Sequence, residues 1–145
     1  MNDFDKAMEF VFQWEGGYSI DPDDLGGETK YGISKRAYPS LSIKDLTVDQ
    51  AKDIYLMDYW HRAGCISMVY PLNIVMMDTA VNMGVGGAKR LLAKTASDNP
   101  IDKADELIAS RELRYKRIAD LNPSQKKFLK GWLNRTTALR TFVGL

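Results

Sequence analysis

Glu15 is the residue of this sequence whose type and setting best suit acid catalysis. It follows Trp14 at the end of an apolar helical pattern, and Gly16 and Gly17 come directly after it. Cleavage of a glycosidic bond requires a carboxylic acid that protonates the leaving oxygen, and apolar surroundings keep such an acid protonated. Glycines at this point leave room for a bulky polymer. The pattern therefore predicts that Glu15 is the general acid of a glycosidase.

A glycosidase needs a second group that either attacks the sugar or activates a water molecule. The loop after Glu15 offers several carboxylates and hydroxyls: Asp21, Asp23, Asp24, Glu28, Thr29 and Tyr31. An acidic loop rich in glycine is also typical of a solvated turn or a calcium site, although the spacing of an EF-hand is absent. Residue type alone does not select among these candidates.

Other kinds of catalysis have little support in the sequence. Cys65 is the only cysteine and His61 is the only histidine. A single cysteine excludes an internal disulfide and a cysteine-based metal cluster, and a single histidine leaves few ways to build a nucleophilic triad. We therefore expect no metal and no cofactor, and we assign His61 and Cys65 no role.

The elements that must position Glu15 are mainly helical. Apolar residues at helical spacing predict a helix over residues 4–12, which the two glycines end, so that Glu15 lies at its C-terminal end. Residues 17–32 are rich in Gly, Asp and Pro and predict a structured loop or a small β-hairpin. Further helical patterns cover residues 47–59, 72–83, 88–97, 102–121 and 123–142. Glycines at positions 84, 86 and 87 are expected to stop the helix before them.

Several motifs resemble those of glycoside hydrolase family 108, the N-acetylmuramidases found in phages and prophages. The motifs are Glu15-Gly-Gly-Tyr18, Asp21-Pro-x-Asp24, Gly26-Gly-Glu-Thr29-x-Tyr-Gly-Ile33-Ser34, Asp78-Thr-Ala-Val-Asn-Met-Gly84 and Gly131-Trp-Leu-Asn-Arg135. The resemblance is specific, because these motifs are spread over most of the chain and use rare residue combinations.

The resemblance implies a mainly α, lysozyme-like fold and cleavage of the β-1,4 bond between N-acetylmuramic acid and N-acetylglucosamine in peptidoglycan. The glutamate of the family's Glu-Gly-Gly motif is its catalytic acid, and this position is Glu15. The order of Glu, Asp and Thr before Tyr-Gly-Ile is also similar to the phage lysozymes. It indicates that Asp24 and Thr29 position water or stabilise the cationic transition state. A lytic transglycosylase, which needs only Glu15, and a non-catalytic wall-binding protein remain as alternatives.

The chain length predicts one domain over residues 1–145, and its C-terminal part departs from the family's pattern. Family members often carry a peptidoglycan-binding segment with an Asp-Gly-x-x-Gly-Pro loop, which residues 91–102 lack. We therefore expect a catalytic part over residues 1–88 and a shortened helical part over residues 89–145. Whether the second part binds the wall by itself stays open.

Residues expected to contact the glycan are Tyr18, Tyr31, Asn82, Trp132 and Arg135. Trp132, Trp14 and Trp60 could each stack on a sugar ring, but an aromatic residue at helical spacing is more often part of the core. We expect two of these three tryptophans to be core residues. Structural hydrogen bonding is an equally good interpretation of Asn82 and Arg135.

The two halves of the chain differ in charge. Residues 1–60 hold 6 Lys or Arg against 12 Asp or Glu, whereas residues 61–145 hold 14 against 7. The basic half suits an anionic polymer such as peptidoglycan, or the halves form complementary lobes. Nucleic acid is not an expected partner, because no nucleic-acid-binding motif accompanies the charge.

The beginning of the sequence lacks the pattern of a signal peptide, and no stretch is apolar enough to span a bilayer. We therefore expect a monomer that is made in the bacterial cytoplasm, does not insert stably into membranes, and acts in the periplasm or cell wall. By analogy with the family, the expected route is phage lysis through a holin-type pore. Delivery to competing bacteria as a secreted effector is the alternative.

Overall fold

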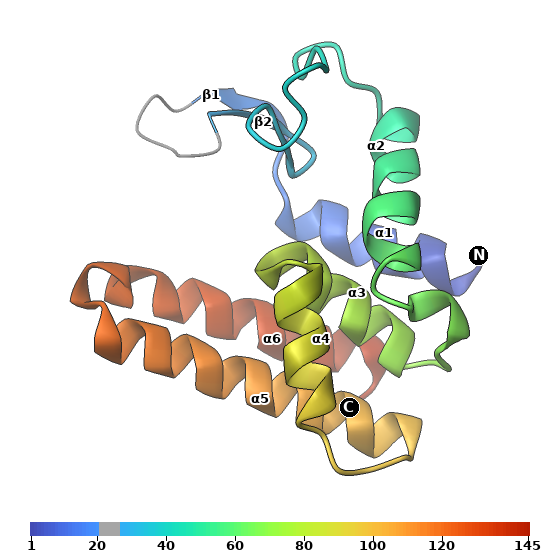
Figure 1. Cartoon of the computed structure of the whole chain (residues 1–145), viewed down its shortest axis with the longest axis vertical. Coiled ribbons are helices and arrows are strands. Elements are labelled where there is room, and N and C mark those ends of the chain that lie inside the picture. The colour runs from blue at the N-terminus through green and yellow to red at the C-terminus, as the bar shows by residue number, and fades with distance from the viewer. Residues whose placement is uncertain (21–26) are drawn as a thin grey trace.

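The protein, described here from a computed structural model that covers residues 1–20 and 27–145, is mainly α-helical. Its α-helices are α1 (Asp3–Trp14), α2 (Val48–Tyr55), α3 (Leu72–Met83), α4 (Val85–Ala93), α5 (Pro100–Leu121) and α6 (Leu129–Val143). Figure 1 shows a small sheet set apart from α5 and α6 and joined to the helices through α1 and α2. The expected mainly α fold with a small β element after the first helix is confirmed.

The sheet is a small antiparallel meander with the order β1 (Ser19–Ile20), β2 (Glu28–Lys30) and β3 (Ile33–Ser34). Ser19 pairs with Thr29 across β1 and β2, and Thr29 pairs with Ser34 across β2 and β3. Thr29 is therefore the central residue of the sheet. Asp21, Asp23 and Asp24 lie outside the described residues.

Side-chain caps fix where the helices begin. The Asn2 side chain accepts a hydrogen bond from the backbone of Asp5 (2.7 Å) at the start of α1. Thr47 and Gln50 form the capping box that their spacing predicts at the start of α2. Asn99 caps α5, with Pro100 in its first turn.

Helix α3 is the centre of the fold. Every residue from Leu72 to Ala80 is buried, and α3 packs against α1, α4, α5 and α6. One continuous apolar core surrounds it, built from residues as far apart in the sequence as Ala7 and Val143. A helix that is buried on all sides has no solvated face for a charged residue, so Asp78 within it requires partners inside the protein. None of the described helices combines the length and the apolar character that crossing a bilayer requires.

Several element boundaries differ from those predicted. The helix expected over residues 47–59 ends as α-helix at Tyr55 and continues as a π-helix over Leu56–His61. The helix expected over residues 123–142 begins as a 3₁₀-helix over Pro123–Phe128, and α6 starts only at Leu129. In both places the apolar periodicity is helical, but it does not distinguish α from tighter or wider turns.

The helix expected over residues 88–97 is also misplaced, because α4 already begins at Val85 and ends at Ala93. Gly84 ends α3 as predicted, with a φ of 85°. The prediction that Gly86 and Gly87 also stop the helix was wrong, since both lie inside α4. A Cβ at Gly87 would lie 3.7 Å from the Cβ of Met83, which is an ordinary van der Waals contact.

Candidate active site

Glu15 lies where α1 ends and the chain turns toward the sheet, as the sequence predicts. Its backbone N–H donates to the carbonyl of Val11 (2.8 Å), and its φ and ψ of −93° and 115° then direct the chain out of the helix. The Glu15 side chain is 26% exposed. Its carboxyl group is therefore held at the protein surface with one side open to solvent.

A hollow of about 320 Å³ lies beside this carboxyl group, and we call it the Glu15 hollow. The residues that line it are Glu15, Gly16, Gly17, Tyr18, Ser19, Thr29 and Gly32. A Cβ at Gly16 or Gly17 would meet no atom of the described residues within 4 Å, so neither glycine position is crowded by the described part of the chain. Among the described residues that line the hollow, Glu15 is the only acid.

Hydroxyl groups face the hollow from the sheet. Thr29 Oγ1 and Ser19 Oγ share a hydrogen bond of 3.1 Å across β1 and β2. The hydroxyl of Tyr18 donates to a carboxylate oxygen of Glu28. The hollow is thus lined by one carboxyl group and by three hydroxyl-bearing residues, of which Ser19 and Thr29 are on the sheet.

The two-residue turn between β2 and β3 lies against Glu15. Tyr31 and Gly32 both have positive φ, 54° and 80°, which is typical of the tight turn of a β-hairpin. The buried hydroxyl of Tyr55 donates to the carbonyl of Tyr31 (2.7 Å) and so fixes the turn. Burial and the nearby charge of Glu15 raise the pKa of Tyr55, which keeps this phenol a hydrogen-bond donor.

We predict that Gly32→Ala disturbs both the turn and Glu15. The added Cβ would lie 2.3 Å from Tyr55 Oη and 3.0 Å from Glu15 Cγ, so a group that positions the acid must move. We expect the glycosidase activity that the sequence predicts to fall by a factor of about ten or more, measured as kcat, because a displacement of about 1 Å at a reacting group can cost a factor of about 100.

The matched control for this change is Gly27→Ala. Gly27 also has a positive φ, 69°, but a Cβ there would meet no atom of the described residues within 4 Å. Both variants therefore carry similar backbone strain, and only the first meets Glu15 and Tyr55. An equal loss of activity in both variants would mean that strain, and not the contact with Glu15, causes the loss.

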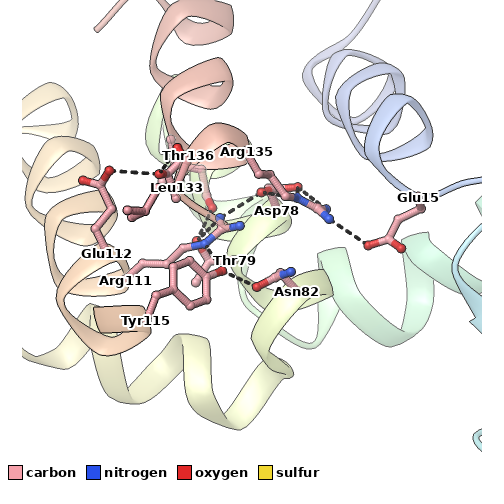
Figure 2. A network of polar contacts seen from close by, with 11 residues as sticks. Glu15, Asp78, Thr79, Asn82, Arg111, Glu112, Tyr115, Leu133, Arg135 and Thr136 are labelled. Carbon is pink, nitrogen blue, oxygen red and sulfur yellow. Dashed lines mark hydrogen bonds and ion pairs between the residues drawn. The ribbon is translucent and has the colours of Figure 1, made fainter. Parts of the chain in front are cut away.

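Behind Glu15 lies a buried network of ion pairs (Figure 2). Arg135 Nη1 donates to Glu15 Oε1 (3.0 Å), while its Nη2 donates to Asp78 Oδ1 (2.7 Å). Arg111 Nη1 donates to the other oxygen of Asp78 (2.8 Å). Two guanidinium groups thus surround Asp78, and one of them extends from Asp78 to Glu15.

The charges of this network balance as two cations against two carboxylates. Arg111 and Asp78 are almost completely buried, and the side chain of Arg135 is 8% exposed. Burial alone would raise the pKa of Asp78, but the charges and hydrogen bonds of Arg111 and Arg135 lower it below its ordinary value. The neighbouring carboxylates of Asp78 and Glu15 outweigh burial at Arg135 and raise its pKa. Asp78 and Arg135 therefore both remain charged at neutral pH.

The network continues away from Glu15 to Tyr115 and Asn82. Arg111 Nε donates to the hydroxyl of Tyr115 (2.7 Å), which in turn donates to the side-chain oxygen of Asn82. In Figure 2, Glu15 lies at one end of this series of contacts, and Tyr115 and Asn82 lie at the other. No cluster of His, Cys, Asp and Glu able to hold a metal ion occurs within residues 1–20 and 27–145.

The structure brings some of the predicted site residues together and separates others. Tyr18 and Thr29 line the Glu15 hollow, whereas Tyr31 is in the adjoining turn with its ring against Phe12. Arg135 is buried and bound to two carboxylates. Asn82 and Trp132 line a different cavity, described below.

Sequence reasoning missed the support behind Glu15. It predicted apolar surroundings for the acid, yet Arg135 contacts Glu15 directly, and Asp78 and Arg111 hold Arg135 in place. Asp78 offered one signal, because it is the only charged residue in the apolar sequence of α3. Such a residue requires a buried cation.

The family model described as Glycosyl hydrolase 108 matches residues 8–84, which include Glu15, Thr29, Gly32 and Asp78. The chain belongs to this family. It is therefore a glycosidase, and the family supports peptidoglycan as the polymer on which it acts. Among curated proteins, none matched the sequence.

A solved structure extends the family comparison beyond the matched residues. The structure of Brucella abortus SagA resembles this glycosyl hydrolase with a TM-score of 0.75 and 28% sequence identity. The similarity covers 95% of this chain and 91% of that chain. The mainly α, lysozyme-like fold that the sequence predicts is confirmed. Arg111 and Arg135 lie beyond the range of the family model, but they complete the ion pairs of Asp78 and Glu15.

Proposed function

We propose that this glycosyl hydrolase cleaves the β-1,4 bond between N-acetylmuramic acid and N-acetylglucosamine, with Glu15 as the general acid. One observation carries the proposal: the Glu15 carboxyl group faces an open hollow on one side and is held by Arg135 on the other. A general acid needs this combination of a fixed position and access to the leaving oxygen. The two glycines beside it leave space for the sugar polymer.

The two oxygens of the Glu15 carboxyl group have different roles in this proposal. Oε1 accepts from Arg135, whereas Oε2 has no hydrogen-bond partner among the described residues. Because Arg135 occupies Oε1, we assign the proton transfer to Oε2. Oε2 then donates the proton to the glycosidic oxygen as the bond to the muramic acid C1 breaks.

The second half of the reaction is assigned to the loop and the sheet. Water attacks C1 of the muramic acid and loses a proton, which gives a reducing muramic acid and a glucosamine with a free 4-hydroxyl. We propose that Thr29, which faces the hollow from β2, positions this water. Asp24, outside the described residues, is proposed to accept its proton or to stabilise the cationic transition state. Tyr18 is proposed to contact the glycan, because it lines the same hollow and is exposed.

Arg135 is a positioning residue in this proposal, and Arg135→Lys tests it. A lysine has no planar fork that reaches Asp78 and Glu15 at once, so the substitution releases Glu15. We expect kcat to fall about tenfold or more, with KM changed less than about twofold, because the interaction orients the acid and does not bind substrate.

Arg140→Lys is the control for Arg135→Lys. Arg140 is on the same helix and also pairs with two carboxylates, Asp105 and Glu112, but none of these residues contacts Glu15. This variant is expected to keep wild-type kcat. A larger rise in KM than fall in kcat for Arg135→Lys would assign Arg135 to glycan binding instead.

A lytic transglycosylase is a second candidate, and one observation favours it. Glu15 is the only acid among the described residues that line its hollow, and a transglycosylase needs one acid. In that reaction the 6-hydroxyl of the muramic acid, and not water, attacks C1 and gives a 1,6-anhydro product. The two reactions therefore differ in the end that they leave on the glycan.

Mass spectrometry of digested peptidoglycan distinguishes these reactions. After borohydride reduction, hydrolysis at the proposed bond gives muramitol ends, whereas transglycosylation gives anhydromuramic ends that resist reduction. Glucosaminitol ends would mean that the other β-1,4 bond is cut. If no ends form although the protein binds peptidoglycan, the chain is a wall-binding protein without activity.

The biological setting proposed is lysis of a bacterial cell by a phage or prophage enzyme, released through a holin-type pore. This setting rests on the resemblance of the motifs to phage muramidases. Residues 1–88 are proposed as the catalytic part, which agrees with the range of the family model. Residues 89–145 contribute Arg111 and Arg135 to the support of Glu15, so we propose that they assist catalysis as well as substrate binding.

A further inference from the structure

A second and larger cavity lies at the other end of the buried ion-pair network. It has a volume of about 770 Å³ and is formed by the end of α3 together with α4, α5 and α6. Asn82 and Tyr115, the last two members of the network, are part of its wall. Because of its charge, we call it the basic cavity.

The wall of the basic cavity combines cations with apolar and aromatic surface. Arg90 comes from α4, Lys94 directly follows the end of α4, and Arg114 comes from α5. No acidic residue is among the described residues that line the cavity. None of the three cations forms an ion pair within residues 1–20 and 27–145. Three cations without anionic partners around one concave surface are suited to an anionic ligand.

The remainder of the wall limits what this ligand is. Trp132 stacks on Tyr115 with ring centroids 5.1 Å apart, and side chains such as Leu91 and Ile118 add apolar surface. The cations belong to two different segments of the chain: Arg90 and Lys94 lie in or directly after α4, and Arg114 lies in α5. A ligand that fits carries separated carboxylates with small apolar groups between them, as an acidic peptide does.

We infer that the basic cavity binds the acidic peptide stem that muramic acid carries in peptidoglycan. The inference rests on the proposed function for the identity of the polymer, and on the cavity itself for the chemistry. Arg90, Lys94 and Arg114 bind the carboxylates of the stem, and Trp132 and its apolar neighbours contact its alanine methyl groups. The enzyme then selects glycan strands that carry peptides over strands from which the peptides have been removed.

Two variants with equal change in charge test this inference. Arg90→Ala/Arg114→Ala removes two cations from the cavity. Lys116→Ala/Arg117→Ala removes two exposed cations of α5 that do not line it. All four residues are exposed, so both variants are expected to fold.

The first measurement is kcat/KM on peptidoglycan strands with intact peptides and on strands stripped of peptides by an amidase. Wild type is expected to prefer the intact strands. The cavity variant is expected to lose about tenfold on intact strands through KM and to be unchanged on stripped strands. The control variant should match wild type on both. The inference is overturned if wild type has no preference, or if the cavity variant loses equally on both substrates or on neither.

The second measurement does not depend on bond cleavage. N-acetyl-L-alanyl-γ-D-glutamate is titrated into the protein at millimolar concentrations, and the indole N–H resonance of Trp132 is followed by NMR. We expect this resonance to shift in wild type and in the Lys116→Ala/Arg117→Ala variant, and to shift far less in the cavity variant or with the diamide of the peptide. Binding without any peptidoglycan cleavage would overturn the proposed function and retain the subsite, whereas absence of a shift would overturn the subsite alone.

Discussion

Glu15→Gln is expected to lower kcat on peptidoglycan by a factor of about 10² to 10⁴, the usual contribution of a general acid. Glutamine has the same shape as glutamate, and its amide oxygen can still accept from Arg135, so the hollow and the network behind it are retained. What is lost is the proton that the carboxyl group donates to the leaving oxygen. The measurement is the initial rate of release of soluble fragments from purified peptidoglycan.

The control for this variant is its affinity for the substrate. Binding of Glu15→Gln to insoluble peptidoglycan, measured by sedimentation, is expected to equal that of wild type. The free energy of unfolding is expected to change little, because Glu15 is partly exposed. Wild-type turnover by this variant would remove Glu15 from the mechanism.

Asp78→Asn is expected to have the largest effect on stability, with a loss of about 3–5 kcal/mol in the free energy of unfolding. Among the described residues, Asp78 is the only carboxylate that contacts Arg111, and it shares Arg135 with Glu15. Removing its charge leaves two guanidiniums with one partly exposed carboxylate. The variant is to be compared with wild type by urea denaturation at neutral pH. The control is Asp105→Asn, whose carboxylate is mostly exposed beside Arg140 and should contribute at most about 1 kcal/mol.

We also predict that wild type and Asp78→Asn differ in how their stability depends on acid pH. The pKa of Asp78 is lower in the folded protein than its ordinary value of 3.8, so the ionised form stabilises the fold above this pH. That contribution is lost as the pH falls below about 3.8 and toward the folded pKa. Wild type should therefore lose its stability advantage over Asp78→Asn as the pH falls through this range. An advantage that stays constant down to pH 2 would contradict the assignment of the lowered pKa to Asp78.

Much of the fold can be predicted from short local patterns in the sequence. The apolar stripe of α1 and the capping box at Thr47 each depend on residues within a few positions of one another. The same holds for the position of Glu15, since two glycines after an apolar stripe predict the end of a helix. The exact bounds of α4 and α6 were not predicted, because Gly86 and Gly87 lie inside α4 and the 3₁₀ start at Pro123 does not change the apolar periodicity.

The support of Glu15 could not be predicted in this way, because it depends on contacts between distant parts of the chain. Arg135 is 120 positions from Glu15 and 57 from Asp78. The sequence offered Arg135 as a possible contact for the glycan, and its burial between two carboxylates favours the structural alternative. Trp60 is a core residue with its ring edge against Phe4, whereas Trp132 is partly exposed in the basic cavity. The distinction between these tryptophans required the packing of the helices.

The buried ion-pair network connects the Glu15 hollow with the basic cavity. Glu15 lines the hollow in which we propose that the bond is cut, and Arg135, Asp78 and Arg111 support it from inside the helical core. The basic cavity lies at the far end of the same network. Residues on α3, α5 and α6 therefore support both the proposed acid, which directly follows α1, and the proposed peptide subsite.

Whether Glu15 donates a proton to the leaving oxygen is tested most directly by changing the leaving group. Two muramic acid glycosides are compared, one with the natural glucosamine and one with 2,4-dinitrophenol, which leaves without protonation. We measure the first-turnover rate of wild type and of Glu15→Gln on each. If Glu15 is the acid, the first-turnover rate of the variant on the natural glycoside is lower than that of wild type by a factor of about 10² to 10⁴, whereas its rate of dinitrophenolate release is almost unchanged. An equal loss on both substrates would contradict this role, because Glu15 would then act in some way other than as the acid.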